Sequence, residues 1–196
     1  MEIQSAWDLV NSPEPYPRAI PILMKHLKKP YHPKIKEGIV RALTVKEAWG
    51  VAGSPLIEEF LKISSQQTNA EQDLKWVIGN ALSVVADDGV FEEIVDLAID
   101  KQHGIACEML AVALGNMRNP RAVDVLMGLL NDEEVTGHAL IALGKLKAQK
   151  ARQQIEHFVE HPKPWARKEA RRALAKIDKI TRTVNAVGSP PVQNPL

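Results

Sequence analysis

Two histidines four residues apart, His157 and His161, have a spacing that could support metal chemistry. Residues i and i+4 lie on one face of a helix, so both imidazoles could reach a single Zn²⁺ ion. A zinc site needs further ligands, and the sequence offers no third ligand beside this pair, which Pro162 follows at once. We interpret the two histidines as surface residues near a helix end. The sequence predicts no metal and no cofactor.

Nucleophilic chemistry has little support in the sequence. The one cysteine, Cys107, lies within the apolar stretch Ile105–Leu110, so we expect a small buried residue rather than a reactive thiol. None of the serines lies in a nucleophile-elbow motif, and no glycine-rich phosphate loop is present. The sequence therefore predicts a protein without catalytic activity. A single cysteine forms no intramolecular disulfide, which together with the absence of any long apolar run favours a cytoplasmic protein that does not enter a membrane.

The elements that carry these residues are set by an internal repeat. Residues 17–24 match residues 120–127 at five of eight positions. A second segment, similar to Ala-Leu-Gly-x-aliphatic, recurs every 29 to 39 residues at 42–45, 81–85, 113–117, 142–146 and 173–177. A period of this length is typical of helical solenoids. Each unit is therefore predicted to consist of a first helix, which ends near the Ala-Leu-Gly segment, and an amphipathic second helix.

Helical spacing of apolar residues predicts an all-α fold. In one second helix the apolar positions are Val123, Leu126, Leu129 and Leu130. We expect Gly115 and Gly144 just beyond helix ends, in the left-handed conformation. The expected helices are 3–10, 17–28, 33–48, 55–63, 70–86, 89–100, 104–116, 120–130, 133–146, 149–160 and 165–180. They form one domain over 1–182, followed by a disordered tail over 183–196 that has three prolines.

These repeats resemble the short HEAT-like repeats of the phycobilisome-lyase type. The resemblance implies a right-handed α-α superhelix of about five repeats, with second helices lining the concave surface. Relatives of this kind include scaffolds, immunity proteins, lyases and hydroxylases. The hydroxylases need His-Glu pairs in several repeats to hold iron, and no His-Glu pair occurs in this chain. An interaction module is the leading interpretation, and a lyase-like or isomerase-like role stays open.

Charge is distributed unevenly along the chain. Residues 71–134 carry four basic and thirteen acidic side chains, whereas residues 135–196 carry twelve and four. With the second helices placed on the concave side, we expect a groove that is acidic at its centre and binds a protein partner with a basic patch. The expected groove residues are Glu58, Glu59, Glu92, Glu93, Asp96, Asp100, Arg121, Asp124, Gln153 and His157.

A basic cluster occupies the last expected helix. It suggests the alternative that the protein binds nucleic acid through phosphate contacts. The acidic groove argues against a DNA glycosylase, which needs a basic concave surface. The cluster consists of Arg167, Lys168, Arg171, Arg172, Lys176 and Lys179.

Overall fold

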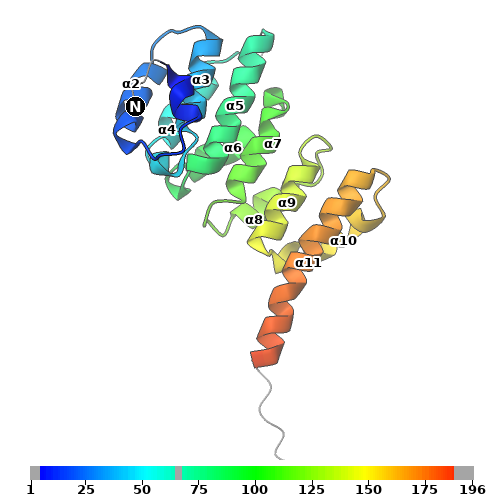
Figure 1. Cartoon of the computed structure of the whole chain (residues 1–196). Helices are drawn as coiled ribbons and strands as arrows, with labels where there is room; N and C mark the ends of the chain where they lie inside the picture. The colour runs from blue at the N-terminus through cyan, green and yellow to red at the C-terminus, as the bar shows by residue number, and fades with distance from the viewer. Residues whose placement is uncertain (1–4, 65–67, 188–196) are drawn as a thin grey trace, which may run out of the picture.

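The computed structural model describes residues 5–64 and 68–187, with side chains described up to residue 179. The described residues form eleven α-helices in two layers and contain no strand, which confirms the expected all-α solenoid (Figure 1). One layer consists of the odd-numbered helices α1 (Ala6–Val10), α3 (Pro33–Leu43), α5 (Asn69–Val85), α7 (Ala106–Leu114), α9 (Thr136–Leu146) and α11 (Pro164–Val187). The other consists of the even-numbered helices α2 (Ile20–Leu27), α4 (Gly53–Leu61), α6 (Phe91–Ile99), α8 (Ala122–Leu129) and α10 (Arg152–Glu156).

Short 3-10 helices connect the two layers. They are η1 (Pro17–Ala19), η2 (Lys46–Ala48), η3 (Asp88–Val90), η4 (Lys101–His103), η5 (Gln149–Ala151) and η6 (His157–Glu160). The helix expected over 33–48 is divided into α3, which ends at Leu43, and η2; the Thr44 hydroxyl after α3 donates to the Val40 carbonyl at 2.8 Å. At the other end of the chain, α11 continues to Val187, past the expected boundary at 182. Residues 188–196 of the expected tail lie outside the described residues.

Local sequence signals explain where the central helix α5 begins. The Thr68 backbone N–H donates to the Glu71 carboxylate at 2.8 Å, and the Glu71 N–H donates back to the Thr68 hydroxyl at 3.4 Å. This capping box satisfies amides that have no partner within the helix. The hydrogen bonds from Thr68 also lower the pKa of Glu71. The reciprocal pair therefore defines the first turn of α5.

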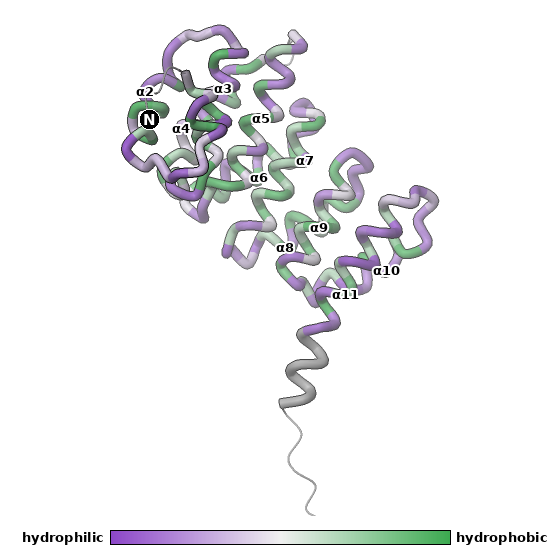
Figure 2. Tube along the Cα trace, in the orientation of Figure 1, coloured by the Kyte–Doolittle hydropathy of each residue, from purple (hydrophilic) through white to green (hydrophobic). Residues whose placement is uncertain are grey.

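A single hydrophobic core runs between the two layers. The largest side chains in it are at most 2% exposed and come from both layers. Hydrophobic and hydrophilic residues alternate along the helices of both layers (Figure 2). Burial of each such leucine or isoleucine side chain contributes about 1.5–3 kcal/mol to the stability of the folded state. Examples are Leu56, Ile94 and Leu126 from the even helices and Ile78 and Leu110 from the odd ones.

Glycines permit very close contact between neighbouring odd helices. A Cβ atom on Gly115 would lie 2.6 Å from the Ala142 Cβ, and a Cβ on Gly144 would lie 2.7 Å from the Ala173 Cα. The expected left-handed conformation is wrong at both positions, because Gly115 has φ −69° and Gly144 lies inside α9. Lys147 ends that helix in the left-handed region instead, with φ 53°. Close helix packing is therefore the reason for both glycines.

Helix spacing shows which layer lies on the inside of the curve. Neighbouring odd helices run close together along much of their length, whereas neighbouring even helices approach each other at few points. In a curved two-layer stack, the helices of the inner layer are the more closely spaced. The odd helices therefore form the inner layer and line the concave side, and the even helices form the outer layer. The expectation that second helices line the concave surface was wrong, because the small residues that allow tight spacing lie on the first helices.

Candidate binding surface

Most acidic side chains of the outer layer are neutralised by basic residues of the adjacent repeat. Glu92 of α6 pairs with Arg121, the residue before α8, and Asp124 of α8 pairs with Lys150 of η5. Glu58 is 3.3 Å from the Lys28 ammonium. These exposed ion pairs join adjacent repeats through long side chains. Each contributes about 0–1 kcal/mol to the free energy of unfolding. They also reduce the negative charge that the outer surface presents to a partner.

Glu59 is buried, contrary to the expectation that it faces a groove. Only 3% of its side chain is exposed, and its carboxylate contacts the Lys36 and Lys62 ammonium groups. Lys36 belongs to α3, so the pair links the inner and outer layers. Glu59 therefore has a structural role and offers no surface to a partner.

The remaining expected groove residues are exposed or serve as local caps. Glu93 and Asp96 are exposed on α6 and have no ion-pair partner among the described residues. Asp100 is a cap, because its carboxylate accepts from the Gln102 N–H at 3.0 Å. Gln153 and His157 are exposed on α10 and η6. Glu93 and Asp96 are thus the exposed carboxylates of α6 that have no ion-pair partner among the described residues.

The basic cluster lies on α11, the last helix of the inner layer. Arg167 donates to the carbonyls of His161 and Pro162 at 2.9 and 2.8 Å, so it stabilises the preceding turn. Arg172 donates to Glu169 at 2.8 Å. The other side chains of the cluster are exposed and extend the positive surface along α11, namely Lys168, Arg171, Lys176 and Lys179.

A strip of apolar side chains crosses the middle of the inner layer. Trp76 of α5 lines a cavity of about 350 Å³ together with Ile105 and Arg41, which shows that α3, α5 and α7 share this face. On α7, Val112 lies four residues from both Glu108 and Asn116. On α9, Ile141 lies three residues after His138 and four before Lys145.

Two contacts between α7 and α9 align these residues. Glu108 faces His138 at 3.8 Å, and the Lys145 ammonium donates to the Asn116 side chain. Val112 and Ile141 therefore lie opposite each other. We call Trp76, Ile105, Val112 and Ile141 the inner strip. Ile105 is 57% exposed and Ile141 is 39% exposed.

Sequence reasoning missed the inner strip because it placed the wrong layer on the concave side. The sequence nevertheless contained a signal. Gly115 and Gly144 fall in equivalent positions of the first helices, where small residues allow close helix packing, and the second helices have no equivalent pair. Close packing marks the inner layer of a curved stack.

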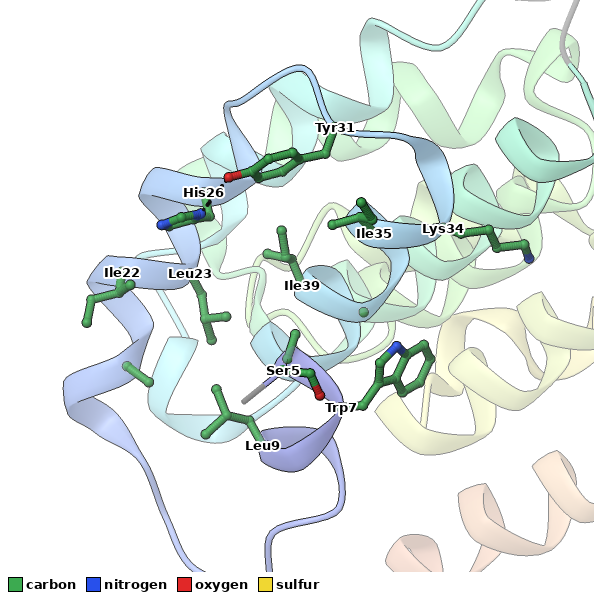
Figure 3. Close-up of a pocket in the computed structure, with 13 residues that line it drawn as sticks. Ser5, Trp7, Leu9, Ile22, Leu23, His26, Tyr31, Lys34, Ile35 and Ile39 are labelled. Carbon is green, nitrogen blue, oxygen red and sulfur yellow. Dashed lines mark hydrogen bonds between the residues drawn. The ribbon is translucent and has the colours of Figure 1, made fainter. Parts of the chain in front are cut away.

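The N-terminal helices α1 to α3 enclose a cavity of about 760 Å³ (Figure 3). Leu23, Ile35 and Ile39 from α2 and α3 line its interior, with Trp7 of α1 on one side. At its upper edge the Tyr31 hydroxyl and the His26 Nδ1 are hydrogen-bonded at 2.9 Å.

Cys107 is buried in α7, as expected. Its thiol is 2% exposed and donates to the Asp100 carbonyl at 3.4 Å. Burial, with the neighbouring Asp132 and Asp100 carboxylates, raises the pKa of Cys107 to about 11. The thiolate is the reactive form, so this cysteine is a poor nucleophile at neutral pH.

The raised pKa predicts a loss of stability at alkaline pH. An unfolded chain ionises Cys107 near its ordinary pKa of 9.0, whereas the folded chain does so near 11. The stability due to the neutral thiol is therefore complete below pH 9 and is lost as the pH rises to about 11. Urea unfolding at pH 8 and pH 10.5 should show a larger loss in the wild type than in Cys107→Ala. Equal losses in the two proteins would contradict the prediction.

The described residues contain no group of three or more side chains able to hold a metal ion. His157 is exposed, and the His161 ring stacks on Phe158 with 5.6 Å between centroids. Among the described helices, none has the length and apolar character needed to cross a membrane.

Comparison with known families identifies the repeat. The family described as PBS lyase HEAT-like repeat matches residues 108–132, which cover most of α7 and all of α8. The chain contains a HEAT-like repeat. The match covers one helix pair of the chain. No curated protein matches the sequence significantly.

Two solved structures of engineered proteins are similar to the chain. An engineered protein solved by the Northeast Structural Genomics Consortium has a TM-score of 0.51 and 20% identity, over 89% of this chain and 89% of that chain. A designed armadillo repeat protein has a TM-score of 0.45 and 16% identity, over 88% of this chain and 98% of that chain. The first likeness supports the helical-repeat fold. Such folds commonly present extended concave surfaces to protein partners.

Proposed function

We propose that the protein is a non-catalytic interaction module that holds a protein partner against the inner strip. The observation that carries the proposal is the set of exposed and half-exposed apolar side chains on three adjacent inner helices. Interface centres are enriched in aromatic and apolar residues surrounded by polar ones. Trp76 and Ile141 provide such anchors, and Arg41, His138 and Lys145 provide the polar surroundings.

Charge indicates which partner suits this surface. The α9 and α11 end of the inner layer presents Lys145, Lys168, Arg171 and Lys176, all exposed. Complementary charge favours a partner with acidic residues next to an apolar segment. The alternative is a partner with a basic patch that binds Glu93 and Asp96 on the outer layer. Ion pairs neutralise much of the rest of that acidic surface, which supports the inner strip. A cytoplasmic setting is part of the proposal and accords with the free thiol of Cys107.

Capture of the native partner by tagged variants separates these possibilities. Ile141→Asp/Lys145→Glu changes one turn of α9 on the inner strip, and Glu93→Lys/Asp96→Lys is the matched control on α6. All four side chains are exposed, so each substitution should change stability by less than about 0.5 kcal/mol. We expect the inner variant to lose at least about tenfold in partner recovery, because a hot-spot residue contributes about 2 kcal/mol. The control should recover the partner as the wild type does.

The opposite pattern would refute the proposal. Loss of the partner in Glu93→Lys/Asp96→Lys, with recovery unchanged in Ile141→Asp/Lys145→Glu, would show that the outer acids bind it. Recovery that nuclease treatment abolishes would instead support nucleic-acid binding through α11. That mode also predicts an affinity that falls steeply with salt.

A further inference from the structure

The cavity between α1, α2 and α3 presents apolar side chains that the described residues leave uncovered. Ile22 is 60% exposed and Ile35 is 54% exposed, and both line the cavity. Leu23 and Ile39 are buried and form its interior. The volume of about 760 Å³ lies within the range of clefts that bind ligands. The cavity is therefore large enough to take up several apolar side chains of a bound segment.

Two aromatic side chains held by the fold lie at opposite edges of the cavity, with Ile39 between them (Figure 3). One is Trp7, which packs on α3 so closely that a Cβ on Gly38 would lie 3.2 Å from its Nε1. The other is Tyr31, whose ring stacks on His26 with 5.9 Å between centroids and whose hydroxyl is hydrogen-bonded to it. Because these contacts position both rings, the cavity is formed before anything binds in it.

The cavity has no unpaired charge for a ligand. Lys34 lines it, and its ammonium lies 3.1 Å from the Glu37 carboxylate and 3.2 Å from that of Asp73. Among the described residues that line the cavity, none is a carboxylate. A charged segment would lose hydration here without gaining a partner. The cavity therefore favours a segment that is neutral and apolar.

The chain contains a neutral segment of this kind after α11. Residues 188–196, which lie outside the described residues, read Gly-Ser-Pro-Pro-Val-Gln-Asn-Pro-Leu, with three prolines and no charged side chain. Proline-rich segments favour the extended polyproline II conformation, and proteins bind such segments in grooves lined by aromatic side chains. Val192 and Leu196 add apolar side chains. The segment and the cavity thus match in charge and in chemistry.

The segment is too short to bind the cavity of its own chain. It begins where α11 ends, and α11 runs out of the stack at the end opposite to α1, α2 and α3 (Figure 1). Five steps between neighbouring odd helices separate α1 from α11, which is at least about 40 Å at the usual 8–10 Å a step. The nine residues span about 30 Å when fully extended. The segment can therefore occupy this cavity only in another copy.

We propose that residues 188–196 of one copy bind in the cavity between α1, α2 and α3 of a second copy, so that the chains associate head to tail. An interface of this kind uses two different surfaces, so it can join more than two copies. Each added copy brings another inner strip, and linked strips bind a partner with repeated segments more tightly than a single strip does. The association itself does not depend on what the inner strip binds.

Sedimentation velocity of the full chain over a concentration series tests the proposal, and the mean mass of the wild type should rise with concentration. Ile35→Asp places a charge in the cavity, and Pro190→Ser/Pro191→Ser/Pro195→Ser removes the prolines of the segment. Each variant should weaken self-association at least about tenfold. Leu61→Asp is the matched control, because Leu61 of α4 is 61% exposed and does not line the cavity. It should associate as the wild type does.

Mixing the two defective variants distinguishes head-to-tail binding from other modes of association. The Ile35→Asp chain keeps an intact segment and the proline variant keeps an intact cavity, so the mixture should form a heterodimer and no larger species. A peptide of residues 186–196 with both ends blocked should also bind the proline variant, at one site per chain. Self-association that the proline variant retains would overturn the proposal. A wild type that stays monomeric at every concentration, or a peptide that does not bind, would overturn it as well.

Discussion

Replacing Gly115 with alanine is expected to lower the free energy of unfolding by about 2 kcal/mol, the usual cost of forcing a methyl group into a packed core. The new Cβ would lie 2.6 Å from the Cβ of Ala142 and 2.9 Å from its Cα. Helices α7 and α9 would have to separate to admit it. Gly144→Ala should cost a similar amount, because its Cβ meets the Ala173 backbone at 2.7 Å. Urea unfolding followed by circular dichroism measures both.

The same substitution at Gly128 is the matched control. Gly128 is exposed in α8 of the outer layer, and a Cβ there would meet nothing within 4 Å. Alanine should therefore stabilise the protein by about 0.5–1 kcal/mol, the ordinary difference in helix propensity. Opposite signs at Gly115 and Gly128 are the expected result. A stabilising Gly115→Ala would contradict the close packing of the inner layer.

Replacing Glu59 with glutamine is expected to cost about 3 kcal/mol, as in other cases where one partner of a buried ion pair is removed. The Glu59 carboxylate is 3% exposed, and its partner Lys36 is 13% exposed, so the substitution leaves a largely buried ammonium without a counter-charge. Lys62 is 57% exposed and can move into solvent. Lys36 cannot do so without disturbing the contact between α3 and α4.

Two further variants isolate the buried pair. Glu58→Gln removes the adjacent carboxylate, whose ion pair with Lys28 is 54% exposed on both sides, and should cost less than about 1 kcal/mol. Lys36→Met/Glu59→Met removes both charges and should recover most of the stability lost in Glu59→Gln. Thermal unfolding of all three variants provides the comparison. Similar losses for Glu58→Gln and Glu59→Gln would mean that Glu59 is exposed in solution.

The repeat and the helices could be predicted from the sequence because helical periodicity is a local property. The apolar face around Leu126 and the recurring Ala-Leu-Gly segments can both be recognised from residues that lie three or four apart in the sequence. The two layers were assigned to the wrong sides because curvature arises from contacts about thirty residues apart, such as that between Gly115 and Ala142. A glycine near a helix end has two explanations, a left-handed cap and close packing. Only the position of the neighbouring helix distinguishes them.

Side-chain partners explain why the candidate site could be predicted only in part. Glu58 and Glu59 are adjacent in sequence, yet one is exposed and the other is buried against Lys36 of another helix. The ion pair between Glu92 and Arg121 likewise joins residues of different repeats. From the sequence such residues were interpreted as an acidic patch. In the folded protein, ion pairs with basic side chains neutralise their negative charge. Glu93 and Asp96 have no ion-pair partner among the described residues.

Site-specific photo-crosslinking in the native host tests most directly whether the inner strip holds the partner. A photoreactive phenylalanine analogue at Ile141 probes the inner layer, and the same analogue at Ile99, which is 55% exposed on α6, probes the outer layer. A discrete crosslinked species is expected from position 141 and none from position 99. A crosslinked species from position 99 alone would contradict this expectation.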